Sequence, residues 1–211
     1  MNKNKYFVKF LNKNDISSHS LIISVIFFIF SFWLLGKHEM WRDELQAWLL
    51  ARDSSNLISL SQNLKAEGHP GLWHYILFPL TRFFSNPLSM QILHLLISTC
   101  SVYVIFKWSP FTRIQKIFLT FSYFLFYEYS LIARSYCLST LLIFIFCKLF
   151  ENKQKNMIKI SFVLLLLSHT SILGLFISVC LFMTIIIEHL IEFFTKNEEV
   201  KNIWKRSNFI A

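Results

Sequence analysis

The chain has 211 residues, of which 55% are hydrophobic, 18% are aromatic and only 16% are charged, with a formal net charge of +9. A soluble domain of this length usually carries about 25% charged residues, so the composition argues against an ordinary soluble domain and favours a polytopic α-helical membrane protein. The positive charge does not indicate nucleic-acid binding, because most basic residues lie in the polar segments between or beyond the apolar runs.

The apolar runs, taken in chain order, predict a single membrane domain over residues 1–211. Residues 20–36 follow a basic N-terminal segment and are not followed by a small-residue cleavage site, so we expect an uncleaved membrane helix there. The next apolar runs predict five more membrane helices, at residues 87–108, 114–132, 135–150, 157–171 and 173–194. The expected fold class is therefore all-α, with about six transmembrane helices.

Residues 37–85 form one long loop, in which we expect two or three amphipathic helices at the membrane interface. Residues 57–64 predict a short helix that ends at Gly68. Residues 72–84 are apolar but too few to cross ~30 Å of hydrocarbon at ~1.5 Å per residue, so an interfacial helix bent near Pro79 fits better. The helix before these is predicted by helical spacing of Trp41, Leu45, Trp48, Leu49 and Arg52.

The distribution of basic residues predicts the orientation in the membrane. Six alternating spans place the N-terminus, residues 107–116, residues 148–159 and the C-terminal tail on one side, and these segments hold all but six of the 21 Lys and Arg residues. Cytoplasmic loops are enriched in Lys and Arg. We therefore expect a multi-pass protein of the cytoplasmic (inner) membrane, with both termini in the cytoplasm and loop 37–85 outside.

Two adjacent acids, Asp43 and Glu44, lie between tryptophans in this outer loop. Asp43 can be a helix N-cap with Gln46 three residues later, and acids favour the first turn of a helix. The pair can equally supply a general base for an acceptor hydroxyl, or a carboxylate that binds a divalent metal at a lipid phosphate. One residue can do both, so the two interpretations do not exclude each other.

A second candidate lies in the turn Glu67-Gly68-His69-Pro70-Gly71. Glu67 and His69 could be solvated turn residues, or they could contact a phosphate or hold a metal. Strong metal sites show three or four spaced ligands, so this pair alone is a weak metal signal. A divalent-metal cofactor stays an open alternative.

Arg134 and Tyr136 follow a predicted membrane helix on the outer side. They can belong to an interfacial aromatic belt with a snorkelling cation. The alternative is a site for a lipid-linked phosphate or diphosphate, which the planar guanidinium fork of an arginine suits well.

Together these residues resemble the C-type (GT-C) membrane glycosyltransferases, in the bacterial branch with the protein mannosyltransferases and aminoarabinose transferases. The resemblance rests on Trp41-Arg42-Asp43-Glu44, on Glu67-Gly68-His69-Pro70 and on residues 127–136. It implies transfer of a sugar from a polyprenyl-phosphate donor to an acceptor at the outer face of the membrane. It also implies a catalytic role for Asp43, supported by Glu44, and substrate contacts for Glu67, His69, Arg134 and Tyr136.

Members of this family usually have more membrane helices, so we expect the N-terminal portion of a longer enzyme, or a half that a second polypeptide completes. The alternatives are a non-catalytic membrane scaffold or transporter, and an inactive truncated remnant. A transporter would place ionisable residues along a path through the membrane, whereas here they gather around the outer loop. The expected partners are the lipid-linked sugar donor and the bilayer, without nucleic acid.

Overall fold

The computed structural model of the chain describes residues 3–67 and 70–207. Within these ranges the chain is all-helical, without β-strands, which confirms the predicted all-α class. Its elements are α1 (Lys3–Leu35), α2 (Arg42–Asp53), α3 (Leu57–Asn63), the 3₁₀ turn η1 (Leu64–Ala66), α4 (Leu72–Phe83), α5 (Leu88–Trp108), α6 (Arg113–Thr120), the π-helix η2 (Tyr123–Glu128), α7 (Tyr136–Phe150), α8 (Lys153–Ser168) and α9 (Ile172–Ser207).

Two helical segments in the described ranges are long and apolar enough to cross a membrane, Leu88–Trp108 and Ile172–Thr195, with mean hydropathies of 1.7 and 2.2. His19–Leu35 and Tyr136–Phe150 are apolar but shorter. These segments are compatible with association with a membrane. The count of six spans stays a prediction.

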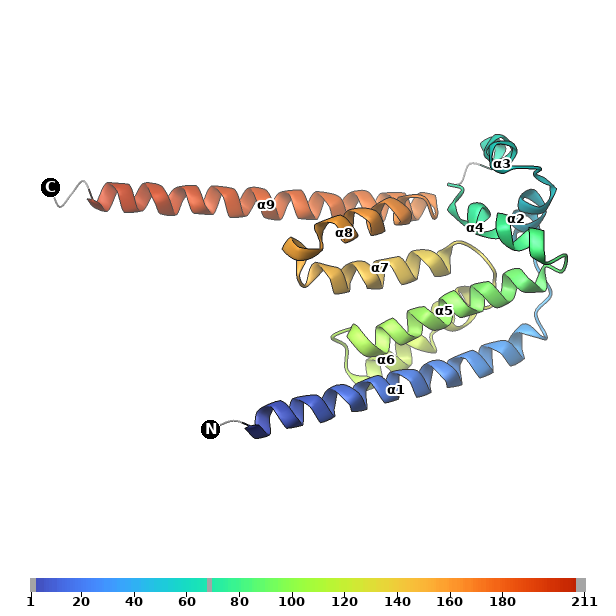
Figure 1. Cartoon of the computed structure of the whole chain (residues 1–211), viewed down its shortest axis with the longest axis horizontal. Coiled ribbons are helices and arrows are strands. Elements are labelled where there is room, and N and C mark those ends of the chain that lie inside the picture. The colour runs from blue at the N-terminus through green and yellow to red at the C-terminus, as the bar shows by residue number, and fades with distance from the viewer. Residues whose placement is uncertain (1–2, 68–69, 208–211) are drawn as a thin grey trace.

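The long helices lie side by side, and the loop helices gather at one end of them (Figure 1). α5 contacts α1 and α7, and α8 contacts α7 and α9. We call the end that carries α2, α3 and α4 the loop end; the N- and C-termini lie towards the opposite, terminal end (Figure 1). The turns from α5 to α6 and from α7 to α8 are at the terminal end, whereas the turn from α8 to α9 is at the loop end.

Two buried apolar clusters hold the long helices together. One joins α1 to α5 and η2 through Phe27, Leu95 and Ile105, which are fully buried. The other joins α7, α8 and α9 and includes Leu167 and Ile185. The side chains of each cluster are closely packed against one another, and these van der Waals contacts account for the pairing of the helices.

The predicted span 114–132 is not one continuous helix. α6 ends at Thr120, and the Ser122 hydroxyl accepts a hydrogen bond from the backbone of Leu125 at 3.5 Å, which starts a new turn. The π-helix η2 follows, and residues 129–135 then form a non-helical connection to α7. Such a connection needs hydrogen-bond partners from elsewhere in the chain, because it has left the helical pattern.

At the loop end, α2 packs against α4 through a face that shares only Trp48 with the predicted stripe. The buried residues of α2 are Glu44, Ala47, Trp48 and Ala51, whereas Trp41 is 50% exposed. Ala47 and Ala51 are small, so the two helices can approach closely, and they pack in one cluster with residues of α4. The larger side chains of Leu45, Leu49 and Leu50 are not among the buried residues of α2.

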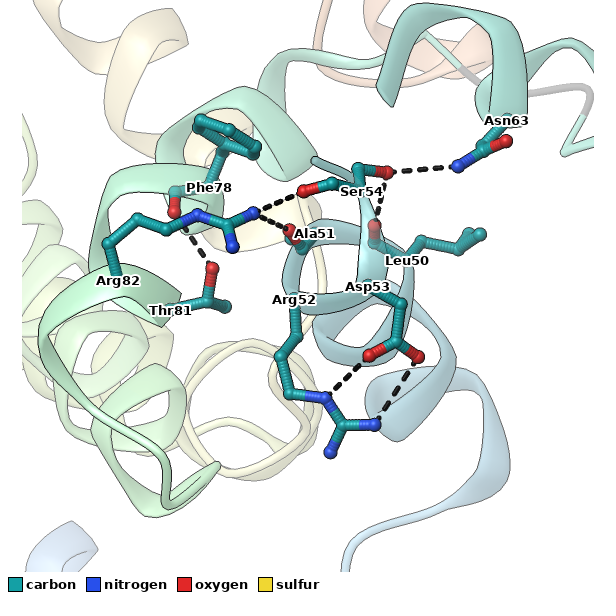
Figure 2. A network of polar contacts seen from close by, with 9 residues as sticks. All are labelled: Leu50, Ala51, Arg52, Asp53, Ser54, Asn63, Phe78, Thr81 and Arg82. Atoms are coloured by element: carbon teal, nitrogen blue, oxygen red, sulfur yellow. Dashed lines mark hydrogen bonds and ion pairs between the residues drawn. The ribbon is translucent and has the colours of Figure 1, made fainter. Parts of the chain in front are cut away.

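Arg82 of α4 fixes the C-terminal end of α2 (Figure 2). Its guanidinium Nη2 donates to the carbonyl of Ala51 at 3.1 Å and to the carbonyl of Ser54. The guanidinium also lies over the Phe78 ring, 4.3 Å from its centroid. The last carbonyls of a helix have no partner within the helix, so this arginine supplies the missing donors and ties α2 to α4.

At the terminal end, ion pairs join α8 to α9. Lys153 Nζ lies 2.7 Å from Glu188 Oε2 and 3.1 Å from Glu192 Oε1. These two carboxylates raise the pKa of Lys153. Beyond these contacts α9 continues past the ends of the other helices (Figure 1).

Candidate functional site

A pocket of about 210 Å³ opens at the loop end, where α2 and α4 meet the starts of α7 and α9. It is formed by four stretches that are far apart in the sequence: the first half of α2, the turn before α4 with the first turn of α4, the start of α7, and the α8–α9 turn. Its lining residues are Asp43, Gln46, Ala47, Glu67, Pro70, Trp73, His74, Ala133, Arg134, Ser135, Tyr136, Thr170 and Ser171.

Asp43 and Arg134 face each other across this pocket. Arg134 Nη2 lies 3.6 Å from Asp43 Oδ2, and the two side chains are 31% and 61% exposed. The Arg134 guanidinium also lies 5.2 Å from the centroid of the Tyr136 ring. An ion pair as exposed as this one contributes little to stability. Both groups can therefore exchange their partner for a ligand at small cost.

Glu67 also lines the pocket and contacts Gln46. Gln46 Nε2 donates to Glu67 Oε1 at 2.5 Å. Gln46 lies three residues after Asp43 on α2, so both side chains are on the same face of that helix. From the sequence, Gln46 was expected only to support Asp43 as the helix N-cap. Its i+3 spacing from Asp43 is the signal that could have indicated a place in the site.

Glu44 does not line the pocket, although it was predicted as part of the catalytic pair. Its side chain is fully buried, and its carboxylate accepts three hydrogen bonds. Oε2 accepts from the backbone of Trp41 at 2.8 Å and from His38 Nε2 at 3.0 Å, and Oε1 accepts from the backbone of Ala133 at 2.6 Å.

The N-cap of α2 is also a different residue from the predicted Asp43. Trp41 occupies the N-cap position of α2, and Glu44, at the third helical position, accepts the Trp41 N–H. Asp43 is thus a first-turn residue, as in the general preference of acids for helix N-termini, but it is not the cap. Of the two acids, Asp43 alone has its carboxylate directed to the pocket.

His69, which was also predicted to contact the substrate, lies outside the described residues. A different histidine, His74 in the first turn of α4, lines the pocket and is buried. Trp73 beside it is also buried, and its ring meets that of His94 edge-on, with centroids 5.9 Å apart. Sequence reasoning missed His74 and Trp73 because residues 72–84 were expected to be only an interfacial helix.

Thr170 and Ser171 complete the pocket from the α8–α9 turn. The Thr170 hydroxyl donates to the carbonyl of Leu167 and accepts from Ser139 Oγ, both at 2.7 Å. The Ser171 hydroxyl accepts from the backbone of Gly174 at 3.0 Å. The sequence indicated a hairpin turn here, but not that the turn reaches the residues of the loop.

The electrostatic character of the pocket comes from helix ends as well as side chains. α4, α7 and α9 all begin at it, because Pro70, Ser135 and Ser171 are lining residues directly before their first turns. Helix N-termini carry partial positive charge. Together with Arg134 they favour an anionic group, while Asp43 and Glu67 supply proton acceptors beside it.

A metal site is not apparent in the described ranges. No group of three or more His, Cys, Asp and Glu side chains there is arranged to hold a metal ion. Glu67, one of the two residues considered as metal ligands, is hydrogen-bonded to Gln46. The other, His69, is not among the residues that the structure describes.

The chain was compared with protein-family models, with curated proteins and with solved structures, and none of them matches it.

Proposed function

We propose that the protein transfers a sugar from a polyprenyl-phosphate-linked donor to an acceptor on the outer face of the cytoplasmic membrane. The observation that carries this proposal is that Asp43, Glu67, Arg134 and Tyr136, which come from three different parts of the chain, line one pocket at one end of the helices. A cation and a carboxylate side by side are what such a transfer needs: one group for the leaving phosphate and one for the proton of the acceptor.

Arg134 is the proposed contact for the donor phosphate. An arginine fork can bind two phosphate oxygens at once. The starts of α4, α7 and α9 add positive potential at the same place. In the transfer, the bond between the anomeric carbon and the phosphate oxygen breaks, and the phosphate leaves with the electron pair. Arg134 stabilises the negative charge that develops there.

Asp43 is the proposed general base. The acceptor oxygen forms the new bond to the anomeric carbon, and its proton passes to the Asp43 carboxylate. Asp43 is paired with Arg134 at 3.6 Å. Binding of a phosphate to Arg134 would compete with this pair and release the carboxylate for the acceptor. The order of binding expected from this competition is donor first, acceptor second.

The membrane orientation belongs to the same proposal. Lys107, Lys116, Lys148 and Lys153 lie near the terminal end, in or beside the turns that follow α5 and α7, whereas the pocket is at the loop end. This supports a cytoplasmic terminal end and an outer pocket. The ring of Tyr136 at the pocket suits a place near the headgroups, where tyrosines are enriched. A lipid-linked donor would then reach the pocket from the outer leaflet.

The test measures release of polyprenyl phosphate, which is a product whatever the acceptor. The chain is reconstituted in proteoliposomes and given polyprenyl-phosphate mannose or polyprenyl-phosphate aminoarabinose, the donors suggested by the resemblance, together with a heat-treated cell-envelope extract that supplies acceptor hydroxyls. We expect release with at least one of them, and a loss of a hundredfold or more for Asp43→Asn, because a general base contributes about 10²–10⁴ in rate.

The matched control is Asp53→Asn on the same helix. Asp53 is exposed and paired with Arg52 at 2.7 Å (Figure 2), and this arginine lowers the pKa of its carboxyl. Asp53 is not a lining residue of the pocket, so the variant should keep full release. Equal release by wild type, Asp43→Asn and empty liposomes would contradict the proposal in favour of a non-catalytic scaffold or an inactive remnant.

A further inference from the structure

The non-helical segment between η2 and α7, residues 129–135, is held by side chains from two other helices. Its residues Ser130, Leu131, Ile132 and Ala133 are almost completely buried. Within the segment and its own neighbourhood, the backbone of Leu131 donates to Tyr127 at 3.0 Å and that of Arg134 to Ile132 at 2.8 Å. Several backbone groups of the segment therefore need outside partners.

Three buried side chains supply partners for this segment. Ser98 Oγ of α5 donates to the Tyr129 carbonyl at 2.7 Å, and His94 Nδ1 of α5 lies 3.2 Å from the Ser130 carbonyl. Glu44 of α2 accepts the Ala133 N–H at 2.6 Å. The exposed fractions of Ser98, His94 and Glu44 are 3%, 1% and 0%.

Two neighbouring residues of α2 contact two neighbouring residues of the segment. Asp43 and Glu44 are adjacent on α2, and their partners Arg134 and Ala133 are adjacent on the segment. The Glu44–Ala133 contact is buried, and the neighbouring Asp43–Arg134 contact is exposed. Since an exposed ion pair does not fix its own geometry, the position of Arg134 opposite Asp43 is set by the neighbouring buried hydrogen bond.

We infer that Glu44, His94 and Ser98 are positioning residues that hold the backbone of residues 129–133 and thereby place Arg134 opposite Asp43 in the pocket. None of them lines the pocket. They act through the backbone next to Arg134. Their importance for sugar transfer rests on the proposed function. Their hydrogen bonds to residues 129–133 do not depend on it.

The chain offers a matched pair of buried serines on α5 to test this. Ser98 reaches across to the segment, whereas Ser101, which is 2% exposed, donates only to the Ile97 carbonyl of its own helix at 3.2 Å. Ser98→Ala and Ser101→Ala remove the same atom from the same helix at the same depth of burial. Only the first removes a hydrogen bond to residues 129–135.

The experiment is hydrogen–deuterium exchange of the whole chain in nanodiscs. Loss of one buried hydrogen bond should raise exchange of the amides of residues 131–134 about two- to tenfold in Ser98→Ala. Ser101→Ala should leave these amides unchanged, and peptides from α8 should exchange alike in both variants and wild type. Equal exchange of residues 131–134 in the two variants, or a rise in α8 as large as in this segment, would overturn the inference.

A second measurement joins the positioning role to the pocket. In the polyprenyl phosphate release assay, kcat/KM for the donor should fall at least threefold in Ser98→Ala and stay at the wild-type value in Ser101→Ala. If wild type releases no polyprenyl phosphate, the proposed function fails while the exchange result still decides the positioning role. A variant that alters exchange but leaves kcat/KM unchanged would overturn the link to Arg134.

Discussion

Two neighbouring acids at the start of α2 have opposite surroundings. Asp43 is exposed and faces Arg134, whereas Glu44 is fully buried with three hydrogen-bond donors around it. The sequence indicated the pair as a site, because two acids between tryptophans are unusual in an apolar chain. It could not assign the roles, since the Ala133 N–H that Glu44 accepts is 89 positions away.

The buried position of Glu44 leads to a prediction for stability. Glu44→Ala leaves the N–H groups of Trp41 and Ala133 without their acceptor, and each unsatisfied buried group costs about 1–3 kcal/mol. We expect a loss of about 2–5 kcal/mol in the free energy of unfolding, measured by thermal unfolding in detergent micelles. Glu39→Ala, which removes an exposed acid of the same loop, should change the midpoint little. Equal midpoints for the two variants would contradict the anchoring role.

At the scale of elements, most helix positions followed from the sequence. The helices expected in the outer loop are present as α2, α3 and α4, and α4 continues through Pro79. Periodicity and turn residues act locally, so they place such elements well. The interruption within 114–132 was missed because hydrogen-bond partners from α5 and α2 stabilise it, and the local sequence does not show them.

The clamp of Arg82 on α2 gives a second prediction, which Figure 2 illustrates. Arg82→Met keeps much of the apolar stem but removes the group that donates hydrogen bonds to the carbonyls of Ala51 and Ser54. Hydrogen bonds from charged groups contribute about 1.5–3 kcal/mol, so urea unfolding should show a loss in that range. Arg52→Met, which breaks only the exposed pair with Asp53, is the control and should unfold nearly as wild type. A larger effect at Arg52 than at Arg82 would contradict the clamp.

The α8–α9 turn gives a third prediction. A Cβ atom at Gly174 would lie 2.3 Å from Thr170 Oγ1 and 2.5 Å from the Leu167 carbonyl, too close for either to remain in place. Gly174→Ala should therefore lower stability by about 1–3 kcal/mol, as overpacking does. At Gly36 the nearest atom would be at 3.6 Å, an ordinary contact, so Gly36→Ala should melt close to wild type. Thermal unfolding of both variants decides this, and a stable Gly174→Ala protein would show that the turn can open.

At the scale of the whole molecule, the pocket and the basic turns lie at opposite ends of the helices. The sequence predicted this separation from alternating spans, which divide the polar segments into two groups, and the basic residues then predicted which group is cytoplasmic. It predicted less about which outer residues meet, since the pocket joins α2, α4, α7 and the α8–α9 turn. The contribution of Thr170 and Ser171 depends on how α8 and α9 pack, which is a property of the complete fold.

The orientation can be measured by labelling with a membrane-impermeant thiol reagent in whole cells. Gln62→Cys in α3 and Gln154→Cys in α8 are both exposed positions, and wild type with its native cysteines gives the background. Gln62→Cys should be labelled from outside, and Gln154→Cys only after the cells are opened. The reverse pattern would invert the proposed topology and move the pocket to the cytoplasm.

The ion pairs of Lys153 with Glu188 and Glu192 mark the level along α9 at which α8 begins. This helix, Ile172–Ser207, is about 54 Å long at ~1.5 Å per residue, well above the ~30 Å of a bilayer core. Lys153 holds it near the level of Glu192, and residues 193–207 continue for about 22 Å beyond. This stretch therefore carries α9 further from the loop end than the helices it packs against (Figure 1).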